Sequence, residues 1–188
     1  KAFAGEIHKS ANRLLTLIHD IIRLSQMDGP MPELVFEPVD LAPIAAATLD
    51  QLKLNAQQMG VTLELDAKSA VVSADRQMME ELLYNLCDNA IRYNVRGGSV
   101  RVEVRPVRDK VIVCVQDTGI GISRENQEHV FERFYRVDKS RSKATGGTGL
   151  GLAIVKHIAA KHHARISLKS ELGRGTRIDV TFERLPRG

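Results

Sequence analysis

The sequence predicts an α/β protein: a two-layer α/β sandwich with a mixed, largely antiparallel sheet, preceded by one long amphipathic helix. Stretches with helical periodicity alternate with short apolar strands, which is typical of one sheet covered by helices. Two pairs of these strands are separated only by polar or glycine-rich turns, a pattern that favours antiparallel hairpins. A doubly wound parallel sheet needs a crossover helix between successive strands, so this order disfavours it.

The first predicted element is a helix over residues 1–28, in which Ile7, Ala11, Leu14, Ile18, Ile21 and Ser25 follow alternating spacings of four and three. That spacing is the seam of a coiled coil or helix bundle, so this helix needs a partner helix. Gly29, Pro30 and Pro32 end it. The predicted domains are therefore residues 1–29 and 30–188. Because the chain begins with Lys1 and not Met, we expect it to be a piece of a longer protein.

The second domain is predicted to open with a strand over 34–39 and a helix that Asp40 caps and Gly60 ends. Asp75 caps the next helix, whose leucines repeat on one face. The other predicted elements are strands at 61–65, 70–73, 99–105, 110–116, 165–170 and 176–182, a short helix after Ser123, and a helix from Leu150 to about Lys161.

The composition limits the class of protein. With 43% hydrophobic and 27% charged residues, the chain has the usage of a globular protein and not of a disordered one. A net charge of +4 and only 4% aromatic residues argue against a nucleic-acid binder, so we expect no nucleic-acid partner. Cys87 and Cys114 lie in apolar stretches and are predicted to be buried and reduced. No apolar run approaches the roughly 20 residues that span a bilayer.

Three glycine clusters are candidates for ligand contacts: residues 117–121 (DTGIG), 146–151 (GGTGLG) and 173–176 (GRGT). Glycine is needed where the backbone adopts a positive φ or approaches a ligand closely, and free N–H groups at a helix start attract phosphate. The second cluster precedes a predicted helix. It has neither the Gly-Lys-Ser/Thr of a P-loop nor the spacing of a dinucleotide fingerprint.

The helix after Asp75 carries polar residues that could bind a nucleotide. Asn85 and Asn89 lie four residues apart on one face, with Arg92 and Tyr93 one turn later. Amide oxygens suit Mg²⁺, and an arginine suits the phosphates that the cation neutralises. Asp117 ends an apolar strand, where its carboxylate can accept a hydrogen bond from the amine of adenine. Each residue taken alone is more typical of a solvated helix face or a turn, so the combination carries the prediction.

Five boxes in order make the sequence similar to a known family. NLCDNAIRYN (85–94) resembles the N box of sensor histidine kinases of two-component systems, and DTGIG resembles their G1 box. FERFYRVD (131–138) resembles the F box, GGTGLGLAIVK (146–156) the G2 box, and GRGT the trailing glycine box. Residues 30–188 thus resemble the catalytic and ATP-binding domain of the GHKL superfamily, which implies a Bergerat-type ATP-binding fold. Residues 1–29 resemble the second helix of the dimerisation and histidine-phosphotransfer hairpin.

The resemblance implies specific site residues. Asn89 and Asn85 would hold Mg²⁺ and, with Arg92, would be the catalytic residues. Asp117 would recognise the adenine amine. The resemblance implies a larger set of ATP-binding residues, which consists of Asn85, Asn89, Arg92, Tyr93, Asp117, Gly119, Gly121, Arg136, Lys139, Gly147, Thr148, Gly149, Leu150, Gly151 and Thr176.

The resemblance also implies the function: an ATP- and Mg²⁺-dependent protein-histidine kinase that transfers the γ-phosphoryl group to a histidine on a hairpin helix absent from this chain. Relay to an aspartate of a response regulator would follow. Related ATPases carry a water-activating Glu at the position of Asn85, so the amide favours transfer to a protein over hydrolysis. Neither His8 nor His19 matches the acceptor motif H-[ED]-x-[KR]-[TS]-P, so we expect no autophosphorylation by this fragment alone.

The same resemblance implies the setting of the parent protein. We expect a homodimer through the N-terminal hairpin, ATP or ADP as ligand, and a parent phosphoprotein anchored in the bacterial inner membrane with this domain in the cytoplasm. Two other functions fit the boxes. One is a freestanding ATPase or serine kinase of the superfamily, such as an anti-sigma-factor kinase. The other is a non-catalytic module that binds nucleotide as a conformational ligand or presents a surface to a response regulator.

Overall fold

The computed structural model describes residue 18 and residues 34–137 and 148–185. Ile18 is helical. The rest of the predicted N-terminal helix and the boundary at Gly29–Pro32 lie outside the described residues.

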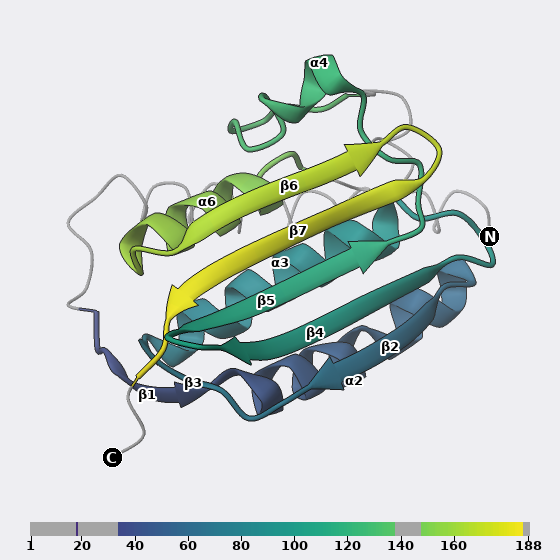
Figure 1. The fold of residues 1–188 in the computed structure, drawn as a ribbon. Coiled ribbons are helices and arrows are strands. Elements are labelled where there is room, and N and C mark those ends of the chain that lie inside the picture. The colour runs from purple at the N-terminus through teal and green to yellow at the C-terminus, as the bar shows by residue number, and fades with distance from the viewer. Residues whose placement is uncertain (1–17, 19–33, 138–147, 186–188) are drawn as a thin grey trace.

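The described chain forms a two-layer α/β sandwich (Figure 1). In chain order, its elements are β1 (Glu37–Asp40), α2 (Leu41–Met59), β2 (Thr62–Ala67), β3 (Val71–Ala74), α3 (Arg76–Arg92), β4 (Ser99–Val107), β5 (Lys110–Asp117), α4 (Arg124–Gln127), α6 (Gly151–Lys161), β6 (Arg165–Glu171) and β7 (Gly175–Glu183). One layer is a five-stranded sheet of order β2-β4-β5-β7-β6, and β1 pairs with β3 beside it. Among the described strands, β2–β4 is the one parallel pair, so the predicted mixed, largely antiparallel sheet is confirmed.

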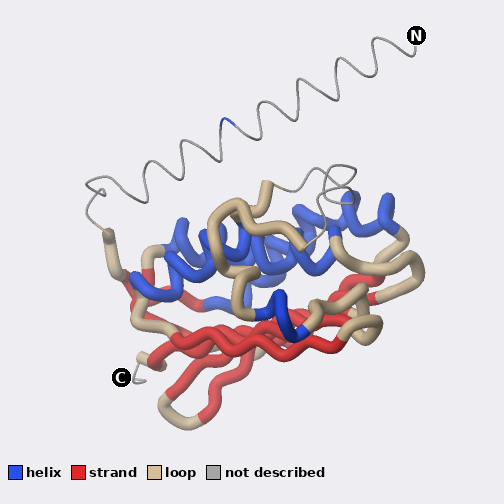
Figure 2. The backbone as a smooth tube through the Cα atoms, turned by 90° about the horizontal axis from the view of Figure 1, so that it is seen from above, coloured by secondary structure: helices blue, strands red, loops and turns tan. Residues whose placement is uncertain are grey.

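Helices α2, α3 and α6 form the second layer and cover one face of the sheet (Figures 1 and 2). Alternate valines of the strands and the apolar face of α3 fill the space between the layers, and Leu82, Leu83 and Leu86 are almost completely buried there. Because α3 lies between α2 and α6, packing on three sides fixes its position. Its remaining face, toward the loops, is the polar one.

The predicted caps occur at the predicted residues. The Asp40 carboxylate accepts from the Ala42 N–H at 3.1 Å, and Gly60 ends α2 in the left-handed region with φ of 69°. The Asp75 carboxylate accepts from the Met78 N–H at 3.0 Å at the start of α3. These local bonds satisfy backbone groups that a helix end leaves open, and they set where the site-bearing helix begins.

The predicted strand over 34–39 is the largest difference. The strand begins only at Glu37, because β3 pairs with Glu37–Asp40 and offers no partner to the exposed Val35 and Phe36. Cys87 and Cys114 are buried and free, as predicted. Within the described ranges, no helix is long and apolar enough to cross a membrane.

Candidate functional site

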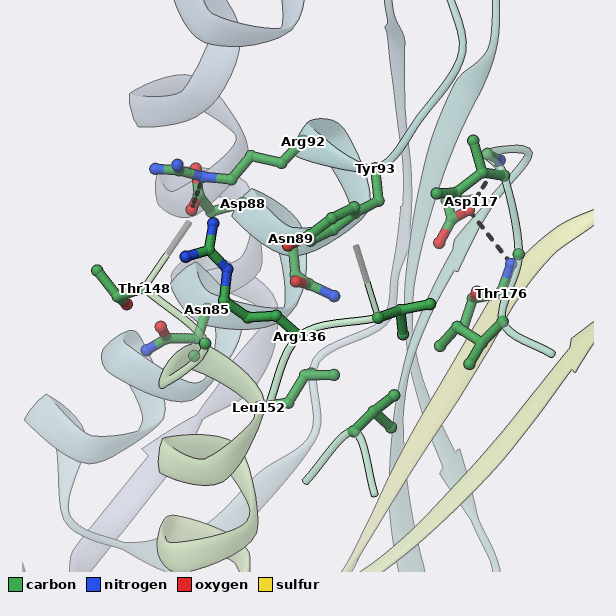
Figure 3. Close-up of a pocket in the computed structure, with 18 of the residues that line it drawn as sticks. Asn85, Asp88, Asn89, Arg92, Tyr93, Asp117, Arg136, Thr148, Leu152 and Thr176 are labelled. Carbon is green, nitrogen blue, oxygen red and sulfur yellow. Dashed lines mark hydrogen bonds and ion pairs between the residues drawn. The ribbon is translucent and has the colours of Figure 1, made fainter. Parts of the chain in front are cut away.

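A cavity of about 1100 Å³ opens between the polar face of α3 and the loops at the end of the sheet. Its walls come from five parts of the chain: α3, the loop 117–122, residues 135–137, residues 148–152 and the turn 172–176. These segments are far apart in sequence and carry parts of all five motif boxes. Figure 3 shows Asp117 and Thr176 at one end of the cavity and Asn85, Asp88, Arg136 and Thr148 toward the other.

The α3 wall carries the four residues predicted for it: Asn85, Asn89, Arg92 and Tyr93 all line the cavity. Asn85 Nδ2 donates to the carbonyl of Glu81 at 2.8 Å. Its Oδ1 therefore points the other way, toward Gly151 at the start of α6, where an added Cβ would lie 3.1 Å from that oxygen. Glycine at position 151 lets the first turn of α6 approach the amide side chain of α3.

Asp88 is a cavity residue that the sequence analysis missed. Its carboxylate pairs with Arg92 at 2.6 Å between Oδ2 and Nε, and both side chains line the cavity. The i,i+4 spacing of Asp88 and Arg92 was the available signal. The pair fixes the guanidinium of Arg92 at this end of α3.

Asp117 forms the opposite end of the cavity. Its Oδ1 accepts from the backbone N–H groups of Gly119, at 2.8 Å, and Thr176, at 3.2 Å. Among the described residues no group donates to Oδ2. Burial raises the pKa of this carboxyl to about 6, against the two backbone hydrogen bonds, which lower it. The cavity thus presents a carboxylate with one unused oxygen.

Close backbone packing shapes the wall around Asp117. A Cβ at Gly119 would lie 2.3 Å from the Tyr93 carbonyl oxygen. Gly175 has a φ of 98°, and a Cβ there would lie 2.0 Å from the Asp117 carbonyl oxygen. No side chain fits at either position, so the glycines allow the loop, α3 and β7 to meet at this end.

Arg136 marks the other end of the cavity. Its Nε and Nη2 are buried, and within the described residues they have no hydrogen-bond partner. In Figure 3 its guanidinium lies among Asn85, Asp88 and Asn89. Helix α6 begins nearby at Gly151 without a side-chain cap, so its first N–H groups are open to a ligand. Buried cationic nitrogens beside uncapped helix amides form an environment for an anion such as phosphate.

The remaining predicted residues differ in their placement. Gly121, Thr148, Gly149 and Thr176 line the cavity. Leu150 does not, because its side chain is buried in the core, and Leu152 lines the cavity instead. Lys139 and Gly147 lie outside the described residues. In the described part of the chain no three His, Cys, Asp or Glu residues gather as a metal site. The oxygen-bearing side chains that line the α3 wall of the cavity include the amides of Asn85 and Asn89 and the carboxylates of Glu81 and Asp88.

Comparisons with known proteins agree with this geometry. The family model "Histidine kinase-, DNA gyrase B-, and HSP90-like ATPase" matches residues 74–187. The chain is 38% identical to the sensor-like histidine kinase SenX3 of Mycolicibacterium smegmatis, over 99% of the chain and 49% of that protein. It is 37% identical to the sensor histidine kinase YkoH of Bacillus subtilis, over 94% of the chain and 38% of that protein. The chain thus spans half or less of the length of these curated relatives.

Solved structures show the same fold. The mycobacterial sensor histidine kinase MprB superposes with a TM-score of 0.71 at 26% identity, covering 81% of this chain and 100% of that one. Full-length ShkA in complex with AMPPNP superposes with a TM-score of 0.84 at 23% identity, covering 100% of this chain and 39% of that one.

Proposed function

Since the chain belongs to the histidine kinase-, DNA gyrase B- and HSP90-like ATPase family, as a histidine-kinase-type ATP-binding domain, we propose that its cavity binds ATP with Mg²⁺. One observation carries the proposal. Among the described residues, one end of the same cavity has a carboxylate oxygen without a donor, on Asp117, and the other end has two buried guanidinium nitrogens without an acceptor, Nε and Nη2 of Arg136. Adenine and a polyphosphate chain supply the groups that these two ends lack.

The adenine end is built for a hydrogen-bond donor. The exocyclic amine of adenine donates to Oδ2 of Asp117, while Oδ1 stays bonded to the backbone of Gly119 and Thr176. The two backbone bonds hold the carboxylate in place before the base arrives. A preorganised acceptor costs little entropy on binding.

The phosphate end is built for negative charge. Arg136 and the first amides of α6 bind phosphate oxygens, and Asp88 holds Arg92 beside them. Gly149 lets the backbone approach that of Phe134 and Tyr135, and Gly151 lets the first turn of α6 approach Asn85. Positioning and charge neutralisation of this kind supply most of the catalysis in phosphoryl transfer.

Asn89 and Asn85 are the residues that would hold Mg²⁺. Amide oxygens are hard ligands, and Mg²⁺ commonly completes its coordination with water and substrate phosphates, which fits a site without a carboxylate or histidine cluster in the described residues. When bound, the ion neutralises phosphate charge. Asn85 itself cannot take a proton from water, which supports transfer to a protein acceptor over hydrolysis.

The acceptor that we propose is a histidine on the hairpin of the parent protein, followed by relay to a response regulator. Residues 1–29 would be the second hairpin helix and would dimerise the parent, and residues 30–188 would be the catalytic domain. Because a kinase needs the ATP of the cytoplasm, we expect this domain on the cytoplasmic side of a membrane-anchored parent. Steady-state phosphate release by the chain alone would instead favour a freestanding ATPase.

Titration calorimetry tests the binding step. We expect one ADP or ATP site per chain, tighter with Mg²⁺ than with EDTA, and much weaker binding of GTP. Asn89→Ala removes an amide oxygen that would hold the ion and should remove most of the gain from Mg²⁺. The absence of Mg²⁺-dependent adenine-nucleotide binding by the wild-type chain would overturn the proposal.

A further inference from the structure

Ser170 lies behind the adenine end of the cavity, on β6, and does not line it. Its hydroxyl nevertheless contacts three groups that build that end. The N–H of Ile122 donates to Oγ at 2.8 Å. The carbonyl oxygen of Gly175 lies 2.9 Å from Oγ, and so does Oγ1 of Thr176. One side chain therefore joins the loop after Gly121 to the first two residues of β7.

The supply of hydrogens decides the direction of each bond. A serine hydroxyl has one hydrogen to donate and two lone pairs to accept with. The carbonyl of Gly175 can only accept, so it takes the hydrogen of Ser170. The N–H of Ile122 occupies one lone pair. The remaining lone pair accepts from the hydroxyl of Thr176.

The backbone around Ser170 is held by a second residue. Gln127 Nε2 donates to the carbonyl of Ser170 at 3.0 Å and to that of Ile122 at 2.9 Å. The hydroxyl of Ser170 thus sits in a fixed frame between α4, β6 and the loop, where it has little freedom to choose other partners.

A consequence follows for Thr176, which lines the cavity beside Asp117 (Figure 3). With its hydrogen committed to Ser170, the hydroxyl of Thr176 presents only lone pairs to a ligand. Oδ2 of Asp117 is also an acceptor when ionised. This end of the cavity then offers acceptors alone, which suits the 6-amino group of adenine and opposes the 6-oxo group of hypoxanthine or guanine.

We propose that Ser170 is a specificity-determining positioning residue: it fixes the hydroxyl of Thr176 as an acceptor, so that the cavity selects 6-amino over 6-oxo purine nucleotides. The proposal rests on the proposed binding of adenine nucleotides. It adds a residue that touches no ligand and acts through Thr176.

The test is the ratio of the dissociation constants for IDP and ADP, measured by titration calorimetry on the full chain. These nucleotides differ only in the group at position 6 and its neighbouring ring proton. In Ser170→Ala the hydroxyl of Thr176 can turn and donate to a 6-oxo group. We expect the IDP/ADP ratio to fall about tenfold, the effect of one hydrogen bond. Ser170→Thr keeps a hydroxyl and should restore most of the ratio.

Two further variants separate this role from mere support of the fold. In a Thr176→Val background Ser170→Ala should leave the ratio unchanged, because the hydroxyl that it controls is gone. Ser167→Ala, at an exposed position on the same strand, should leave the wild-type ratio unchanged. Should Ser170→Ala not fold, judged by circular dichroism, Ser170→Cys keeps the volume and only weakly accepts a hydrogen bond.

The outcomes are distinct. Equal weakening of ADP and IDP by Ser170→Ala, with the ratio unchanged, would overturn the role of Ser170 and leave ATP binding intact. A fall of the ratio in the Thr176→Val background as well would show that Ser170 does not act through Thr176. If the wild-type chain bound no ADP, the proposed function itself would fail, and this inference with it.

Discussion

Replacing Asp117 with asparagine should stabilise the fold while it abolishes tight nucleotide binding. Asparagine keeps an oxygen at the position of Oδ1, so the bonds from the N–H groups of Gly119 and Thr176 survive. It removes a charge that burial penalises. At the position of Oδ2 it has an amide nitrogen. This nitrogen is a hydrogen-bond donor, so it cannot accept from the adenine amine, which is also a donor.

The magnitude follows from the pKa of Asp117, raised by burial from 3.8 to about 6. Because the folded state holds the proton more tightly than the unfolded state, this group destabilises the fold progressively as the pH rises from about 4 to 6. Above pH 6 the full penalty is present, on the order of 2–3 kcal/mol. Asp117→Asn should therefore match the wild type near pH 4 and exceed it by about that amount at pH 7.5.

Urea unfolding at pH 4, 6 and 7.5 measures this difference, and calorimetry with ADP measures the loss of binding, at least about tenfold for a hydrogen bond to a charged group. Asp179→Asn is the matched control. Burial raises the pKa of Asp179, but the hydrogen bonds from Arg177 and Cys114 and the charges of Arg177 and Arg105 together hold it below its usual value. That variant should lose stability at pH 7.5. An Asp117→Asn protein less stable than the wild type at pH 7.5 would refute the reasoning.

Three other substitutions have defined expectations. His162 is buried; its Nδ1 donates to the Ile158 carbonyl, and its Nε2 accepts from the Asp75 N–H. Burial lowers the pKa of His162. The stability that His162 contributes is therefore present above the ordinary pKa of 6.5 and is lost as the pH falls below it. His162→Leu should cost about 1–3 kcal/mol in urea unfolding at pH 8 and less at pH 5; an equal cost at both would contradict this. In Gly175→Ala the new Cβ would lie 2.0 Å from the Asp117 carbonyl oxygen, so the free energy of unfolding should fall by more than about 3 kcal/mol. In Gly173→Ala the new Cβ meets nothing within 4 Å, so the loss should be only the roughly 1 kcal/mol of a positive φ. Similar midpoints of the two variants in thermal unfolding would refute the packing account. Arg136→Met removes buried nitrogens without a partner among the described residues, so the protein should be as stable as the wild type or more stable. The affinity for ADP should fall at least about tenfold, and the affinity for adenosine should not change. An equal loss of affinity for both ligands would argue against a phosphate contact.

Much of the fold could be predicted because the signals are local. Asp40, Gly60 and Asp75 act on backbone groups within a few residues, so their sequence context is enough to place two helices. The hairpin of β4 and β5 follows from alternation and a polar turn. The late start of β1 could not be predicted, since it depends on how much of β3 is available for pairing.

The site divides in the same way. Asn85 and Asn89 lie on one face of α3 because helical spacing dictates it, and Asp88 could have been found by the same spacing from Arg92. The burial that raises the pKa of Asp117 depends on residues far away in sequence, as does the contact of Ser170 with Ile122, 48 positions earlier. Contacts of this kind follow only from the packed sheet.

The most direct test of the central claim is phosphoryl transfer in trans. The chain is incubated with γ-labelled ATP, Mg²⁺ and a purified hairpin that carries the motif H-[ED]-x-[KR]-[TS]-P. We predict acid-labile, base-stable label on the histidine of that hairpin, lost with Asp117→Asn and with a hairpin whose histidine is replaced by glutamine. Release of free phosphate without any labelled histidine, under conditions where ATP binds, would contradict the account.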